Sequence, residues 1–125
     1  MMKKLIPVLC LAIAATSPIA SALTPSEVKW CKATAASFGD RQAAIQKDNA
    51  ERTALAEKAE LAGEAWENAE ALRNFGDAEA AEADKTKLAY DEAKAAFYEV
   101  DTRVTENTIK LNADFEKFNS VCVSG

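Results

Sequence analysis

Asn74-Phe75-Gly76-Asp77 is the strongest helix break in a chain dominated by helix-forming residues, and it lies almost midway between two cysteines. Cys31 is 45 residues before Gly76, and Cys122 is 46 residues after it. In an antiparallel hairpin that turns at Gly76, facing residues have numbers that sum to about 153, as these two do. The sequence therefore predicts an all-α fold: a long antiparallel two-helix coiled-coil hairpin, closed at its base by a Cys31–Cys122 disulfide.

The first 22 residues have the features of a secretory signal peptide. Lys3 and Lys4 precede an apolar run from residue 5 to 15, and Ala20-Ser21-Ala22 is a typical cleavage site. A retained membrane anchor is the alternative, but a span needs about 20 apolar residues, which this run does not provide. We expect cleavage after Ala22.

Export defines the expected compartment and the mature chain. Residues 23–125 form one predicted domain with a formal net charge of −7, because the precursor's −5 includes two leader lysines. We expect a bacterial periplasmic or secreted protein, where a disulfide is stable, with no membrane span after cleavage. Cys10 is not expected to carry a lipid, because Leu9 precedes it where a small residue is needed.

Helix boundaries are indicated by local signals. Thr24 and Glu27 form a predicted capping box around Pro25, and helix-forming residues then continue to Arg73. Gly76 is expected at a left-handed position after the first helix, and Asp77 is expected to cap the second helix. The second helix is predicted to end near residue 119.

The second helix carries a seven-residue apolar repeat, which is typical of a coiled-coil seam. One column is complete and consists of Ala83, Tyr90, Phe97, Val104, Leu111 and Phe118. The companion column begins with Ala93 and Val100, becomes polar at Asn107 and Asp114, and ends with Val121. Single polar residues in a seam often set its register.

The first helix shows a weaker repeat. One column contains Cys31, Phe38, Ile45, Arg52, Ala59 and Trp66, and the other contains Leu55, Ala62 and Ala69. The hairpin register then predicts four neighbouring groups: Phe38 with Phe115, Ile45 with Thr108 and Ile109, Leu55 with Phe97 and Tyr98, and Trp66 with Lys87 and Leu88.

A three-helix bundle is the alternative fold. Ser37-Phe38-Gly39-Asp40 resembles the break at residues 74–77, and a turn there would leave a short first helix over residues 25–38. Such a turn would carry Cys31 away from Cys122. A glycine inside a helix costs only about 1 kcal/mol, so Gly39 is also compatible with one continuous helix.

The chain lacks the residues of common catalytic sites. It has no histidine, which excludes serine–histidine triads and the usual metal ligand. The two mature cysteines are far apart in sequence and form no C-x-x-C pair or zinc set. We expect no enzyme activity and no cofactor or metal. The acidic balance also argues against nucleic acid as a partner.

Glutamates at helical spacing line one side of the first helix at positions 57, 60, 64 and 67. They predict either a solvated helix face or an acidic surface for a partner or a weakly held cation. A hairpin offers no cleft that would desolvate a catalytic carboxyl group, so the solvated face is favoured.

Three aromatic residues are candidate interaction residues. Trp30 and Tyr98 each lie one position from a seam column, so each is either a flank of the core or part of a protein-binding patch. Phe75 lies in the turn, where it is either a local packing contact or a side chain offered to a partner.

These features favour a non-enzymatic interaction or structural module of the bacterial cell envelope, which binds another envelope or extracellular protein or self-associates. In a self-associating form, Arg52, Asn107 and Asp114 would meet across the assembly. The alternatives are a periplasmic holdase-type chaperone or stress factor, and a small secreted inhibitor of a basic enzyme, whose encounter the net charge would steer.

Overall fold

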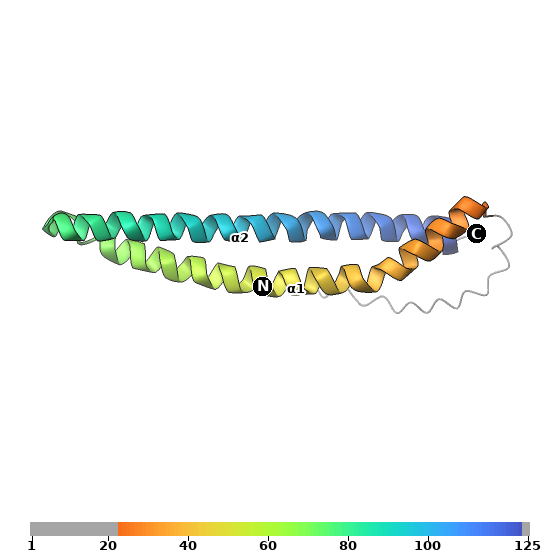
Figure 1. Cartoon of the computed structure of the whole chain (residues 1–125), viewed down its shortest axis with the longest axis horizontal. Coiled ribbons are helices and arrows are strands. Elements are labelled where there is room, and N and C mark those ends of the chain that lie inside the picture. The colour runs from red at the N-terminus through yellow and green to blue at the C-terminus, as the bar shows by residue number, and fades with distance from the viewer. Residues whose placement is uncertain (1–22, 124–125) are drawn as a thin grey trace. The chain divides into compact units, whose positions relative to one another are not determined.

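The computed structural model describes residues 23–123, so the predicted signal peptide lies outside the described part of the chain. Two long helices of 46 and 42 residues make up most of it, and Figure 1 shows them joined by a turn. The element order is α1 (Pro25–Glu70), the 3-10 helix η2 (Arg73–Phe75), α2 (Asp77–Phe118) and the π-helix η3 (Asn119–Val123). The predicted all-α helical hairpin is confirmed.

The described residues divide into two compact units. The disulfide unit contains residues 23–38 and 112–123, and the turn unit contains residues 39–111. Each unit contains one segment of α1 and one segment of α2.

The disulfide unit is held together by a covalent bond and a cluster of aromatic rings. Cys31 and Cys122 form a disulfide with their Cα atoms 6.0 Å apart, as the sequence predicted. Phe38 is only 6% exposed, and its ring centroid lies 5.0 Å from that of Phe115 and 5.4 Å from that of Phe118. The predicted Phe38–Phe115 pair is therefore confirmed.

The turn unit buries the predicted seam of α2. Its buried apolar side chains are Ile45, Ala83, Ala93, Val100, Val104 and Leu111. Asn107, where the companion column becomes polar, is exposed. Ile109, which the register places near Ile45, is 64% exposed.

Aromatic rings replace aliphatic packing closer to the turn. Trp66 stacks on Tyr90 with the ring centroids 5.8 Å apart, and the Lys87 ammonium lies 5.9 Å from the Trp66 centroid. The predicted Trp66–Lys87 neighbourhood is confirmed, and Leu88, the other residue that the register places near Trp66, is 60% exposed. Gly63 makes room for the tyrosine: a Cβ atom there would lie 3.1 Å from Tyr90 Cε1.

The turn differs in detail from its prediction. α1 ends at Glu70, three residues before the predicted end, and the chain continues through a turn at residues 71–72 into η2. Gly76 is extended (φ 167°, ψ 176°) rather than left-handed, so the predicted conformation is wrong. Its carbonyl oxygen accepts a hydrogen bond from the Ala80 N–H at 3.1 Å, which makes Gly76 the N-cap and Asp77 the first helical residue of α2.

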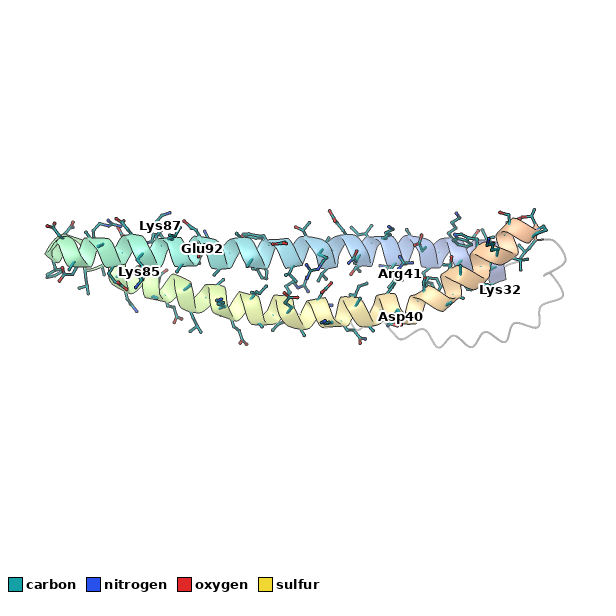
Figure 2. All side chains as sticks on the ribbon, in the orientation of Figure 1. Lys32, Asp40, Arg41, Lys85, Lys87 and Glu92 are labelled. Atoms are coloured by element: carbon teal, nitrogen blue, oxygen red, sulfur yellow. A yellow bond between two sulfur atoms is a disulfide. The ribbon has the colours of Figure 1, made fainter. Side chains whose placement is uncertain are left out.

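Gly39 lies inside α1, so the three-helix alternative is wrong. Figure 2 labels the next two residues, Asp40 and Arg41, on the uninterrupted ribbon of α1. A glycine inside a helix costs about 1 kcal/mol, and the helix-forming residues on both sides offset this cost. Ending the helix here would instead leave backbone N–H and C=O groups without helical hydrogen bonds.

The two helical glycines are expected to respond differently to replacement by alanine. No atom lies within 4 Å of a Cβ atom built on Gly39, so Gly39→Ala is expected to raise the free energy of unfolding by about 1 kcal/mol. Gly63→Ala gains the same helix propensity but meets the Tyr90 ring, so it is expected to stabilise less or to destabilise. Urea unfolding followed by circular dichroism at 222 nm measures both. Equal stabilisation by the two substitutions would contradict the packing of Tyr90 on Gly63.

A capping box begins α1, as predicted. The Thr24 backbone N–H donates to Glu27 Oε1 at 3.1 Å, and the Glu27 backbone N–H donates to Thr24 Oγ1 at 3.1 Å. The hydrogen bond from the Thr24 backbone lowers the pKa of the Glu27 carboxyl group, with a smaller contribution from the Thr24 side chain. Because the folded-state pKa is lowered, the stability that this carboxylate contributes is present above the ordinary glutamate value and lost as the pH falls below it.

This cap predicts a site-specific titration. In a carboxyl-carbon NMR titration, Glu27 is expected to have a midpoint below 4.5, its ordinary value. Thr24→Pro removes the backbone donor and is expected to raise the Glu27 midpoint most of the way back to its ordinary value. Thr24→Ala keeps that donor, so the Glu27 midpoint is expected to stay low. Equal midpoints in the two variants would show that the backbone hydrogen bond is not the main cause.

Candidate functional site

The side chains that could bind a metal ion are dispersed along the described residues. Residues 23–123 hold no group of three or more His, Cys, Asp or Glu side chains arranged to bind a metal ion. A shallow open hollow is lined by Trp66, Glu67, Glu70 and Ala71 and brings together no nucleophile and base. Within the same residues, neither helix has a stretch long and apolar enough to cross a membrane.

Trp30, the first candidate interaction residue, lies in the disulfide unit. Its ring is partly buried, and the Lys117 ammonium lies 4.6 Å from the ring centroid. A cation over the ring face is a favourable electrostatic contact with the aromatic quadrupole. Trp30 thus has a partner within its own unit.

Tyr98 and Phe75, the other two candidates, lie in the turn unit and are exposed. Phe97 is partly buried, and Tyr98 flanks it with a ring-centroid distance of 5.5 Å. Phe75 is 77% exposed and belongs to η2, where its backbone N–H donates to the Leu72 carbonyl at 3.0 Å. The structure therefore presents both Phe75 and Tyr98 to solvent.

A row of exposed apolar side chains that sequence analysis missed leads toward the turn. Leu61 is 67% exposed, Ala65 is exposed, and Leu72 is 50% exposed. Intervals of four and seven residues place these three within roughly 40° of one another around a helix, and Leu72 keeps a right-handed helical backbone just past the end of α1. Phe75 extends the exposure into η2. We call these four residues, Leu61, Ala65, Leu72 and Phe75, the apolar stripe.

Polar side chains form one edge of the apolar stripe. An α-helix turns about 100° per residue, so exposed Asn68 lies roughly 20° around the helix from Leu61, on the side away from Ala65. Glu57 and Glu64 lie roughly 40° and 60° from Leu61 in the same direction. The residue nearest the stripe on this side is therefore an amide, and the carboxylates begin just beyond it.

The carboxylates of this edge continue around α1. Glu60 and Glu67 lie further round on the same side, and all four glutamates are exposed. We call these four residues, Glu57, Glu60, Glu64 and Glu67, the glutamate ladder. Among the ion pairs of residues 23–123, none involves a member of the ladder.

Negative charge is concentrated around the stripe. Residues 57–92 hold eleven acidic and four basic side chains, a formal net charge of −7. The rest of residues 23–125 holds nine acidic and nine basic side chains. The whole net charge predicted for the mature chain therefore belongs to the 36 residues around the turn.

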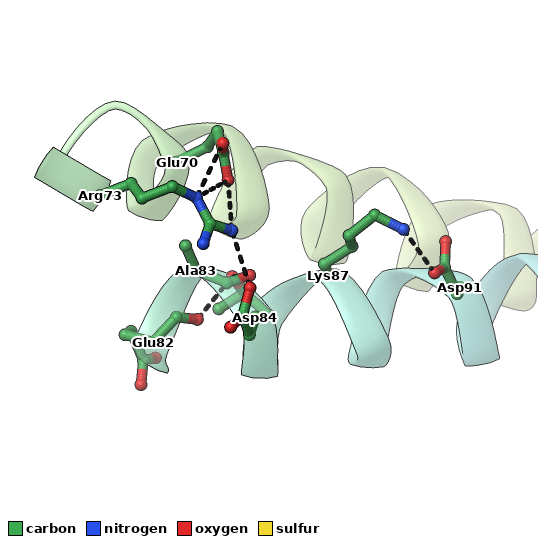
Figure 3. A network of polar contacts seen from close by, with 8 residues as sticks. Glu70, Arg73, Glu82, Ala83, Asp84, Lys87 and Asp91 are labelled. Atoms are coloured by element: carbon green, nitrogen blue, oxygen red, sulfur yellow. Dashed lines mark hydrogen bonds and ion pairs between the residues drawn. The ribbon is translucent and has the colours of Figure 1, made fainter. Parts of the chain in front are cut away.

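Ion pairs hold the end of α1 against α2 at the turn, as Figure 3 shows. The Arg73 guanidinium binds the Glu70 carboxylate at 3.0 Å and the Asp84 carboxylate at 2.8 Å. The hydrogen bond from Arg73 lowers the pKa of Glu70, and the one from Lys87 lowers the pKa of Asp91. Arg73 thus links the two helices next to Leu72 in the chain and so supports the end of the stripe.

Further from the turn, arginines pair with carboxylates on the opposite helix. Arg52 binds Asp101 at 3.0 Å, and Arg103 binds Asp48 at 3.2 Å and Glu51 at 3.3 Å. These contacts balance charge within the turn unit away from the turn itself. Within the described residues, the members of the glutamate ladder take part in none of these ion pairs.

Comparison of the chain with protein-family models, curated proteins and solved structures found no match.

Proposed function

We propose that this protein is an exported, non-enzymatic interaction module of the bacterial cell envelope, and that it binds a partner protein through the apolar stripe. The observation that carries the proposal is the exposure of Leu61, Leu72 and Phe75 in one segment of the turn unit. The same unit buries six other apolar side chains in its core, so the stripe is a second apolar surface left uncovered.

Exposed apolar side chains that gather in one patch mark interaction surfaces, whereas scattered ones need no explanation. Leu61, Ala65 and Leu72 share one side of the chain, so they form a patch of the kind that marks an interaction surface. Phe75 can supply an aromatic anchor, the kind of residue that often dominates binding at the centre of an interface. The disulfide and the Arg73 ion pairs join α1 to α2, and neither involves a stripe residue. The stripe residues can therefore serve binding without a loss of these contacts.

The holdase-type chaperone is the second candidate, and the same exposed apolar residues favour it. A holdase binds many unfolded clients through broad apolar surfaces, whereas here the apolar residues form a narrow row beside an amide and carboxylates. A narrow row with a polar edge is better suited to one partner of matching shape.

Site-specific photocrosslinking in the native compartment tests the proposal. p-Benzoylphenylalanine is introduced at Leu61 or Phe75. Ile109 is the matched control, because it is 64% exposed and lies on α2, outside the stripe. We expect one partner to be captured from both stripe positions and not from Ile109. Binding of that partner is then measured with both proteins purified.

Each other outcome has a defined meaning. Equal capture at Ile109, or capture from Trp30 or Tyr98 with none from the stripe, would contradict the assignment of the stripe. A broad set of unrelated envelope proteins would favour the holdase. No capture from any position would overturn the proposed function.

A further inference from the structure

We infer that the apolar stripe and the glutamate ladder together bind a basic amphipathic helix of another protein. The inference rests on the proposed function and specifies the partner: a helix with an apolar face along one side and Lys or Arg along the adjacent edge. Two independent features of the surface support it, the spacing of the stripe and the position of its charge.

The spacing of the stripe suits a helix. Leu61 and Leu72 are eleven positions apart, most of them within α1, so this part of the stripe extends roughly 16 Å. An apolar row on one helix packs best against a matching row on a second helix, whose apolar residues recur at intervals of three and four. Phe75 follows the row in the chain, in η2, and its 77% exposed ring offers one larger apolar side chain near the turn.

Asn68 limits the width of the apolar contact. Its amide lies between Ala65 and Leu72 along the chain, but on the glutamate side of the row. An exposed amide at this edge can keep hydrogen bonds to water or form them with a polar side chain of the partner. The apolar face of the partner is therefore expected to be narrow, with its polar residues starting at this edge.

The charge beside the stripe determines which helices fit. The glutamate ladder follows the stripe along α1, and none of its members has an ion pair among the described residues. A helix docked on the stripe would bring one of its edges alongside Glu57 and Glu64, the two members of the ladder nearest the stripe. Lys or Arg on that edge would be attracted, and Asp or Glu would be repelled.

The same charge argues against a second copy of this chain as the occupant. Pairing through the stripe would bring two segments of net charge −7 together. An anionic lipid surface is disfavoured for the same reason. A basic partner is attracted by the charge that repels both of these.

A designed peptide tests the inference without knowledge of the natural partner. The probe is a fluorescent helical peptide of about 18 residues, with Leu at i, i+4, i+7 and i+11 and Lys along one edge. One control peptide has Glu in place of each Lys, and a second keeps the composition but scrambles the order. Fluorescence anisotropy with the disulfide-bonded protein is expected to show at least about tenfold tighter binding of the probe than of either control.

Matched variants locate the binding. Leu61→Ser combined with Phe75→Ser is expected to weaken probe binding at least about tenfold, whereas Ile109→Ser, at a similarly exposed position, is expected to leave it unchanged. Glu57→Gln with Glu64→Gln is expected to weaken binding and reduce its salt dependence, because these two carboxylates lie nearest the stripe. Replacing two exposed glutamates of α2 by glutamine, at positions 106 and 116, removes the same charge elsewhere and is expected to have little effect.

Three results would overturn the inference. The first is equal affinity for the basic and acidic peptides, and the second is undiminished binding by the stripe variant. The third is a concentration-dependent dimer in analytical ultracentrifugation that Leu61→Ser abolishes, because a second copy would then occupy the stripe. If photocrosslinking captures one partner at the stripe but the peptides are not distinguished, the proposed function stands and the basic-helix inference fails.

Discussion

Replacing Cys31 and Cys122 together with serine is expected to lower the free energy of unfolding by about 4.5 kcal/mol. The two cysteines are 91 residues apart, so the disulfide closes a loop that contains most of the described chain. The bond removes many conformations from the unfolded state, and the chain-entropy model gives this magnitude for such a loop. Urea unfolding followed by circular dichroism at 222 nm measures the change.

The native sequence in reductant provides the control for this prediction. It is expected to unfold at the same urea concentration as the double serine variant, because both lack the bond and keep side chains of similar size. Hydrogen exchange should show the first loss of protection in residues 25–38 and 112–118, which the disulfide joins. An unfolding free energy within about 1 kcal/mol of the oxidised native protein would contradict the predicted role of the disulfide.

Phe38→Ala is expected to destabilise the protein by about 3–5 kcal/mol. Phe38 is one of the two buried aromatic residues of the disulfide unit, and it contacts the rings of both Phe115 and Phe118. Its removal loses the transfer free energy of the ring and leaves a cavity that the disulfide keeps the neighbouring helices from closing. Thermal and urea unfolding of the oxidised variant measure the loss.

Phe75→Ala is the matched control for this substitution. The same chemical change at a 77% exposed side chain is expected to alter stability by less than about 0.5 kcal/mol. A large loss at Phe75 would mean that the ring is covered within the folded protein, which would also remove it from the apolar stripe. Similar losses at both positions would contradict the burial pattern on which the fold and the candidate site depend.

The main features of the fold could be predicted because several signals agree. The position of Gly76 and the numbers of Cys31 and Cys122 indicate the same hairpin register, and the Phe38–Phe115 contact follows it. The seven-residue column on α2 correctly identified the buried side of that helix. A helix has a regular geometry, so intervals along the sequence translate directly into faces.

The candidate site was harder to predict, because α1 has apolar residues on more than one side. Leu55, Ala62 and Ala69 were correctly placed in a seam column, and each is partly buried. Leu61 and Ala65 also have helical spacing, but they are exposed. Alanine-rich faces differ little in hydrophobicity, so composition alone does not decide which one packs.

By itself, the sequence determined the two helices, the position of the turn and the pairing of Cys31 with Cys122, because helix propensity, apolar periodicity and chain length are local or additive properties. The tertiary structure alone decided that α1 continues through Gly39, that Gly76 is extended, and that Tyr90 packs on Gly63. It also decided that the apolar stripe remains uncovered. The packing of Tyr90 and the exposure of the apolar stripe depend on which side of α1 meets α2, and that contact exists only once the hairpin has closed.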